Sequence, residues 1–270
     1  MNKQQNLITR ISIGLLGIPI VIGLIYLGGI YLTIFMIIIF VLGLSELYDL
    51  LDNKGIPPNK YTTILAGIII LITAGLQPGL VKFIIPLIVI ILLLNILIGN
   101  IKNSVRSLSS SIFSTVYIPL NLGFILLTRQ LPEVGFKITL TTFVTVWACD
   151  TFAYFFGSWL GKKPLAPKIS PNKSIIGAIA GFIGSIVTVT LLYLFKILPN
   201  NISLIKIIGI GILIGVFTQL GDLIESIIKR DMDVKDSGSI LLGHGGVLDR
   251  FDSILIVAPV VYLYSLLFFF

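Results

Sequence analysis

Long apolar segments recur along almost the whole chain, and they restrict its fold more than any other feature. About nine segments approach or exceed the roughly 20 apolar residues that a helix needs to cross a bilayer. These segments are 11–27, 30–44, 61–76, 81–98, 108–127, 138–156, 174–198, 204–220 and 251–270. Only Gly28 and Gly29 separate the first two, which form either a tight helical hairpin or one kinked span. We therefore expect an all-α polytopic membrane protein with about nine transmembrane helices.

The composition supports a lipid environment and excludes several classes of protein. Hydrophobic residues make up 56% of the 270 residues and charged residues only 11%, against about 25% charged in soluble domains. With a mean hydropathy of +1.06, the apolar side chains cannot all be buried beneath a water-facing surface. A soluble enzyme, a disordered chain, a collagen and a coiled coil are therefore excluded. Cys149 is the single cysteine, so no intramolecular disulfide can form.

Basic residues are distributed unevenly between the two sets of loops that nine spans would create. Of the 19 lysines and arginines, 14 fall in the N-terminal segment and the even-numbered loops, and five in the other set. Cytoplasmic loops of membrane proteins are enriched in such residues. The sequence therefore predicts a multi-pass protein of the cell (inner) membrane, with a cytoplasmic N-terminus and the C-terminus on the opposite side. We attribute the net charge of +7 to this topology and expect no nucleic-acid partner.

Acidic residues concentrate towards the C-terminus, where seven of the 12 lie between positions 222 and 252. One face of a helix continuing out of the eighth span carries four polar residues at helical spacing: Asp222, Glu225, Ser226 and Lys229. Asp249 and Asp252 form a second pair, three residues apart. Such oxygen ligands suit Mg²⁺, and one histidine with one cysteine is too few for a zinc site. We expect the metal ligands to be Asp222, Asp249 and Asp252.

Cations and glycines lie between these carboxylates, a combination that is typical of a metal–phosphate site. Glycines let backbone N–H groups approach an anion, and cations neutralise phosphate charge. We expect Lys229 and Arg250 to act in catalysis with the three aspartates. The candidate substrate- and nucleotide-binding residues are Ser226, Arg230, Lys235, Asp236, Gly245 and Gly246. His244 is either a phosphate contact or a plain hydrogen-bonding residue. The alternative for the whole segment is a solvated juxtamembrane loop whose charges pair with each other and with lipid headgroups.

Three further features are open to a functional interpretation. The sixth loop, 158–177, is rich in lysine and proline and leads into a helix that begins near Ser174. It predicts an anion-binding surface at Ser170 and Lys173, or simple enrichment of cations in a cytoplasmic loop. Asp150 lies inside an apolar span and either contacts metal or nucleotide or pairs with a lysine. A third group, at the end of the second span, is better explained as a solvated helix end: Glu46, Asp49 and Asp52.

Three short motifs in the last fifth of the chain carry a family resemblance. They are SIIKR at 226–230, KDSG at 235–238 and GHGGVLDRFD at 243–252. In composition and spacing they resemble the signature of the phosphatidate cytidylyltransferases, or CDP-diacylglycerol synthases. The resemblance extends from Trp147 to the end and includes Asp150, the SPNKS motif at 170–174 and Gly221-Asp222. One position departs from the family, because Ile176 stands where a glutamate is usual.

The resemblance implies an integral membrane nucleotidyltransferase that converts CTP and phosphatidate into CDP-diacylglycerol and pyrophosphate in phospholipid biosynthesis. It also implies a Mg²⁺ requirement, with a second, monovalent cation such as K⁺ as a further candidate, and a homodimer. We expect two regions, N-terminal spans over 1–137 and a catalytic region over 138–270 with a polar cavity near the cytoplasmic face. The alternatives are a related CTP-dependent transferase acting on an isoprenoid or other lipid and, more distantly, a cation-coupled transporter.

Overall fold

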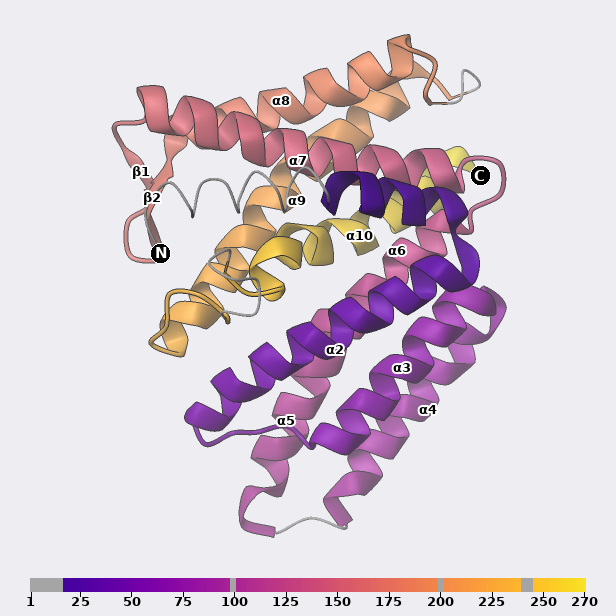
Figure 1. Ribbon diagram of the computed structural model, residues 1–270, viewed down its shortest axis with the longest axis vertical. Coiled ribbons are helices and arrows are strands. Elements are labelled where there is room, and N and C mark those ends of the chain that lie inside the picture. Colours follow the sequence, from indigo (N-terminus) through magenta and orange to yellow (C-terminus); the bar gives the residue numbers. More distant parts are fainter. Residues whose placement is uncertain (1–16, 98–100, 199–201, 239–244) are drawn as a thin grey trace. The chain divides into compact units, whose positions relative to one another are not determined.

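The computed structural model describes residues 17–97, 101–198, 202–238 and 245–270 (Figure 1). Within these ranges seven helices are long and apolar enough to cross a membrane, and two shorter apolar helices accompany them, Gly17–Leu27 and Lys60–Leu76. The expected all-α polytopic membrane protein is confirmed, while the count of nine spans stays a prediction. Only helices satisfy every backbone hydrogen bond within one spanning segment, which explains why such a sequence forms them. The chain forms two compact units, residues 1–127 with 236–250 and residues 128–235 with 251–270.

The first unit contains the N-terminal helices. After the short helix Gly17–Leu27 come α2 (Gly29–Asn53), α3 (Lys60–Leu76) and α4 (Val81–Leu94), and α4 lies between the short 3₁₀ turns η1 (Pro78–Leu80) and η2 (Asn95–Leu97). A third 3₁₀ turn, η3 (Ile101–Asn103), precedes α5 (Ser104–Thr115). A π-helical turn, η4 (Val116–Leu120), then connects α5 to α6 (Asn121–Arg129). Figure 1 shows α2, α3 and α4 side by side.

Two glycines separate the first described helix from α2. Gly28 and Gly29 have φ angles of 61° and 47°, which side chains with a Cβ atom rarely adopt. The chain changes direction sharply at this point (Figure 1). Of the two arrangements that the sequence left open, the structure therefore has two separate helices.

Close contacts between α2 and α3 depend on small residues. A Cβ atom at Gly67 would overlap the ring of Phe40, and one at Gly75 would overlap the side chain of Thr33. Phe40 is fully buried in this contact. Transmembrane helices without a hydrophobic driving force between them pack most closely where such small residues let the backbones approach.

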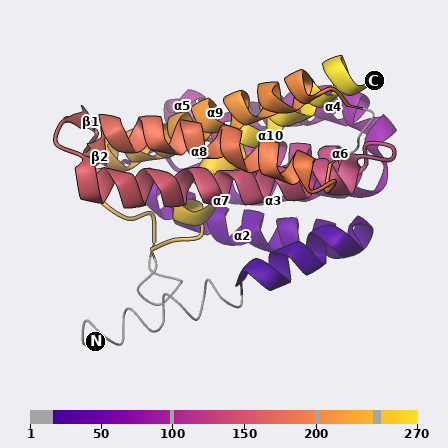
Figure 2. The same cartoon turned by 90° about the horizontal axis from the view of Figure 1, so that it is seen from above.

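The second unit contains α7 (Gly135–Leu160), α8 (Ile175–Leu194), α9 (Leu204–Asp231) and the greater part of α10 (Leu248–Phe269). Helices α7 and α8 lie side by side along their lengths in both views (Figures 1 and 2). Gly177 and Gly181 permit this approach, since Cβ atoms there would lie 2.7 Å from the Ala153 carbonyl oxygen and 2.9 Å from that of Cys149.

A two-stranded antiparallel hairpin joins α7 to α8, where the sequence predicts only a loop. Strands β1 (Pro164–Ala166) and β2 (Ser170–Ser174) pair Pro164 with Ser174 and Ala166 with Ser170. The prolines of this segment fix extended backbone angles, which favours strands over a helix. Ser174 then caps α8, because its hydroxyl accepts a 3.1 Å hydrogen bond from the Gly177 N–H.

Candidate functional site

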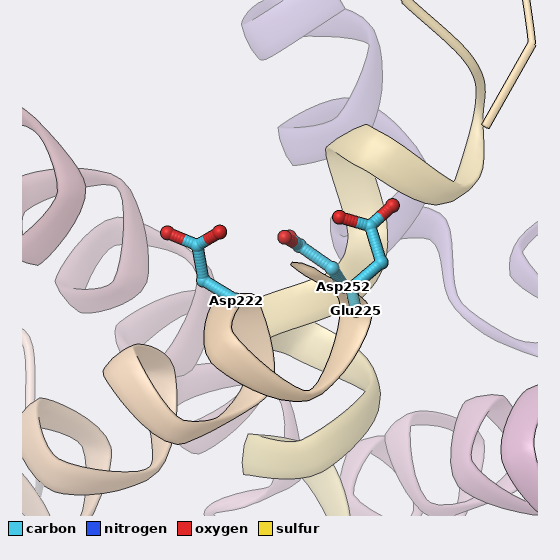
Figure 3. A group of neighbouring side chains, drawn as sticks. All are labelled: Asp222, Glu225 and Asp252. Carbon is cyan, nitrogen blue, oxygen red and sulfur yellow. The ribbon is translucent and has the colours of Figure 1, made fainter. Parts of the chain in front are cut away.

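Three carboxylates of the second unit gather at one point, and two of them come from α9. That helix continues to Asp231, so it carries Asp222 and Glu225 on one face, as their spacing predicts. Asp252, in the first turns of α10, completes the group (Figure 3). One oxygen atom from each of the three side chains lies within 4.8 Å of the others. This separation suits a single hard cation bound by carboxylate oxygens.

Two lysines are paired with this carboxylate cluster, which we define as Asp222, Glu225 and Asp252. The Lys173 Nζ atom at the end of β2 lies 2.5 Å from Asp222 Oδ2. The Lys229 Nζ atom donates a 2.7 Å hydrogen bond to Glu225 Oε2, one turn earlier on α9. The cluster therefore holds cations and carboxylates in direct contact.

Negative charge exceeds positive charge at this point. Asp150 on α7 lies within electrostatic range of both Asp222 and Lys173, which adds a fourth carboxylate. Glu225 and Asp252 are buried, at 3% and 9% exposure. Asp222 is half-buried and Asp150 is exposed, so the burial cost falls on Glu225 and Asp252. Buried carboxylates are costly unless they are paired or bound to a cation. The arrangement therefore favours a bound cation.

Hydrogen bonds from Arg230 connect the β1–β2 hairpin to the end of α9. Its Nε atom donates to the Ile169 carbonyl oxygen at 3.2 Å, and its Nη1 atom donates to that of Val234 at 3.1 Å. The sequence predicts Arg230 as a phosphate ligand, and that role stays a prediction. The contacts give this guanidinium a structural role next to the start of β2.

The described signature residues Ser237 and Gly246 belong to the first unit, and a carboxylate accepts hydrogen bonds from their backbone N–H groups. Asp249 Oδ2 accepts a 2.7 Å hydrogen bond from the Gly246 N–H, and the Ser237 N–H donates to the same carboxylate at 3.3 Å. Gly245 has a φ angle of 79°, where a side chain would be strained. The predicted role of Asp249 as a metal ligand stays a prediction. His244 lies outside the described residues.

The interpretation of Glu46 as part of a solvated helix end is wrong. Its side chain is 3% exposed and accepts hydrogen bonds from Ser237, Val247 and Leu248. Asp49 is exposed, as expected for a helix end. Glu46, Asp49 and Asp52 share the same three-residue spacing, so the sequence does not distinguish Glu46 from the two exposed residues. The hydrogen-bond partners that bury Glu46 are about 200 positions away in the chain.

Comparisons with known proteins place the chain in one family. A sequence model described as the cytidylyltransferase family matches residues 8–268. The chain belongs to the cytidylyltransferase family. A phosphatidate cytidylyltransferase of Synechocystis sp. is 32% identical over an alignment of 287 positions that covers 96% of each chain. Its Staphylococcus aureus (strain COL) counterpart is 35% identical over 87% of this chain and 89% of the relative, and that of Bacillus subtilis (strain 168) is 43% identical over 57% of each.

Other predicted residues of this cytidylyltransferase differ in their surroundings. Ser226 is buried in α9, whereas three of the predicted phosphate ligands are exposed: Lys235, Asp236 and Arg250. Ile176, at the position where the family usually has glutamate, lies exposed in the first turn of α8. Sequence reasoning placed Glu225 on the correct helical face but did not select it as a ligand. Its three-residue separation from Asp222 was the signal that could have identified it.

A cavity of about 240 Å³ in the first unit is not the polar catalytic cavity that the sequence predicts. It lies among the ends of α3, α4 and α5, and Arg106, Asn59 and Asn95 contribute to its lining. None of the predicted site residues lines it. The polar catalytic cavity near the cytoplasmic face stays a prediction.

Proposed function

We propose that this cytidylyltransferase is a phosphatidate cytidylyltransferase, which converts CTP and phosphatidate into CDP-diacylglycerol and pyrophosphate. The observation that carries the proposal is the carboxylate cluster, with Lys173 and Lys229 against it, in a chain of membrane helices. The relatives that bear this enzyme name cover most of the chain and support the choice of substrates.

In the proposed reaction, an oxygen of the phosphatidate phosphate attacks the α-phosphorus of CTP. A new P–O bond forms, and the bond between the α-phosphorus and the bridging oxygen breaks to release pyrophosphate. The attacking phosphate is already ionised at neutral pH, so the chain does not have to supply a general base. Phosphoryl-type transfer depends mostly on positioning and on electrostatic stabilisation. Lys173 and Lys229 would supply positive charge to the phosphates.

The donor set fits a divalent metal, and we propose Mg²⁺. Asp222, Glu225 and Asp252 would hold it, since carboxylate oxygens are the ligands that Mg²⁺ prefers and their atoms converge within 4.8 Å. When bound, such an ion offsets the charge of phosphate oxygens and orients them. Asp249 stays a predicted further ligand, and the signature residues from Lys235 to Arg250 stay predicted contacts of the nucleotide and lipid phosphates.

We further propose that the reaction takes place at the cytoplasmic face of the membrane. The 14-to-5 division of basic residues between the loops supports this orientation, and CTP is available on that side. Phosphatidate keeps its acyl chains in the bilayer while its headgroup meets the nucleotide. We expect a homodimer, as the family resemblance implies.

Transfer of radiolabel from CTP into lipid tests this proposal. The purified protein in mixed micelles is given CTP labelled in the α-phosphate and Mg²⁺ with either phosphatidate or an isoprenoid alcohol. We expect label in the lipid phase with phosphatidate alone, at a mobility that matches CDP-diacylglycerol. Label that requires the isoprenoid alcohol instead, or no label with either lipid, would contradict the proposal.

A further inference from the structure

Glu46 near the end of α2 contacts both ends of the segment that carries the family signature. Its Oε2 atom accepts a 3.1 Å hydrogen bond from the Ser237 hydroxyl, 191 positions later in the sequence. Its Oε1 atom accepts one from the Val247 N–H at 2.7 Å, and Oε2 accepts another from the Leu248 N–H at 3.0 Å. One carboxylate thus contacts Ser237 and, ten positions later, Val247 and Leu248.

The contacts with Val247 and Leu248 make Glu46 an N-cap for α10 supplied from another helix. The first N–H groups of a helix have no partner within it, and a carboxylate at this end is also stabilised by the helix dipole. Capping side chains usually come from the residue that directly precedes the helix. Here that function belongs to a distant residue, so the start of α10 depends on α2.

Two signature glycines leave the space that the Glu46 carboxylate occupies. A Cβ atom at Gly238 would lie 2.8 Å from Glu46 Oε1, and one at Gly246 would overlap Oε2. Gly238 and Gly246 therefore both lie directly against this carboxylate. A solvated helix-end residue would show neither burial nor such a fit, and the exposed Asp49, one turn later, shows neither.

We propose that Glu46 is a positioning residue for catalysis, which fixes Ser237, Val247 and Leu248 of the signature in the conformation that the phosphate contacts require. The inference rests on the proposed function for the chemistry of that segment. Asp249 holds the same segment through Ser237 and Gly246, so two carboxylates from different helices fix one stretch of backbone. Glu46 does not touch substrate in this account and acts only through the segment.

Glu46→Gln tests the proposal while keeping the size and shape of the side chain. The amide NH₂ group would face N–H donors, so at least one capping hydrogen bond is lost. We expect kcat/KM to fall about tenfold or more, mainly through a higher KM for CTP, because hydrogen bonds to a charged group are among the stronger ones. Asp49→Asn is the matched control, since it removes one negative charge from the exposed face of the same helix.

Limited trypsin digestion supplies a readout that does not depend on activity. Arg250 lies in the first turn of α10, so cleavage after it reports fraying of the helix start. We expect Glu46→Gln to accelerate this cleavage about tenfold, within the range that loss of a cap implies, and Asp49→Asn to leave the rate unchanged. Equal cleavage rates and equal KM values in the two variants would overturn the proposal.

Ser237→Ala is a second variant that tests the same contact if Glu46→Gln does not fold. It removes only one of the three hydrogen bonds, and we expect a smaller acceleration of the same cleavage with a smaller rise in KM. Where both variants fold, the double variant should be no worse than Glu46→Gln alone, because the two changes affect one contact. Wild-type behaviour of Ser237→Ala together with a misfolded Glu46→Gln would contradict the positioning role. If Glu46→Gln accelerates the cleavage but the wild-type protein transfers no cytidylyl group to phosphatidate, the proposed function is wrong and the positioning of the helix start by Glu46 still holds.

Discussion

The ammonium group of Lys173 lies 2.5 Å from a carboxylate oxygen of Asp222, and this ion pair connects the end of β2 to α9. The two residues belong to different predicted features, the basic sixth loop and the acidic C-terminal segment. Their contact brings residues of both features together in the second unit. It also places a cation beside the carboxylates that we propose as metal ligands.

Replacement of Lys173 should impair the reaction more than loss of a surface charge would. We expect Lys173→Gln to lower kcat/KM about tenfold or more, because a charge-assisted contact beside the reacting phosphates is lost. Lys196→Gln removes an exposed cation of the same unit and should leave the rate unchanged. Steady-state kinetics at saturating Mg²⁺ measure both variants, and equal rates in the two would remove Lys173 from the site.

Glu225 should contribute to metal binding although the sequence did not single it out. We expect Glu225→Gln to raise the Mg²⁺ concentration needed for half-maximal activity about tenfold or more, since changes in a metal's ligand shells typically have effects of this order. Excess Mg²⁺ should restore part of the rate. Asp231→Asn, an exposed acidic residue on the same helix, serves as the control. A Mg²⁺ dependence of Glu225→Gln identical to that of the control would exclude Glu225 as a ligand.

The geometry of Arg230 should matter as well as its charge. Its guanidinium spans the Ile169 and Val234 carbonyl oxygens, which a lysine ammonium group cannot reproduce. We therefore expect Arg230→Lys to lower the activity about tenfold, nearly as much as Arg230→Gln does. Assays of the two variants side by side separate the alternatives. Full activity of Arg230→Lys would show that only the positive charge is needed.

Much of the fold follows from the sequence because hydrophobic length is a local property. Within the described residues the apolar segments fall largely on helices, and the three-residue spacing of Asp222 and Glu225 placed both on one face of α9. The same spacing predicted that the helix continues out of the apolar span through its charged residues, and α9 ends at Asp231. The β1–β2 hairpin was missed, because its prolines and lysines indicate a loop equally well.

The parts of the site that the sequence could not predict depend on contacts between distant residues. Nothing in the spacing of Glu46, Asp49 and Asp52 indicates that the first is buried and the others exposed. Likewise, Lys173 is one of four lysines in its loop, and only the course of β2 brings it to Asp222. Periodicity identifies which face a residue occupies, but it does not identify what that face meets.

Close packing of α7 against α8 should make Gly177 sensitive to substitution. A Cβ atom there would lie 2.7 Å from the Ala153 carbonyl oxygen, so Gly177→Ala should destabilise the protein by about 1–3 kcal/mol. Gly79→Ala is the control, because nothing lies within 4 Å of a Cβ atom at that position. Thermal unfolding in detergent compares the two variants. Equal unfolding temperatures would contradict the close approach of α7 and α8.

Release of pyrophosphate by the detergent-purified protein tests the central claim most directly. The protein is given CTP and Mg²⁺ with or without phosphatidate, and each reaction is repeated with a chelator and with the Asp222→Asn variant. We predict release that requires phosphatidate, stops with the chelator and is lost in the variant. Release that is independent of phosphatidate, that survives the chelator or that persists in Asp222→Asn would contradict a metal-dependent phosphatidate cytidylyltransferase built on this carboxylate cluster, as would no release from a folded preparation.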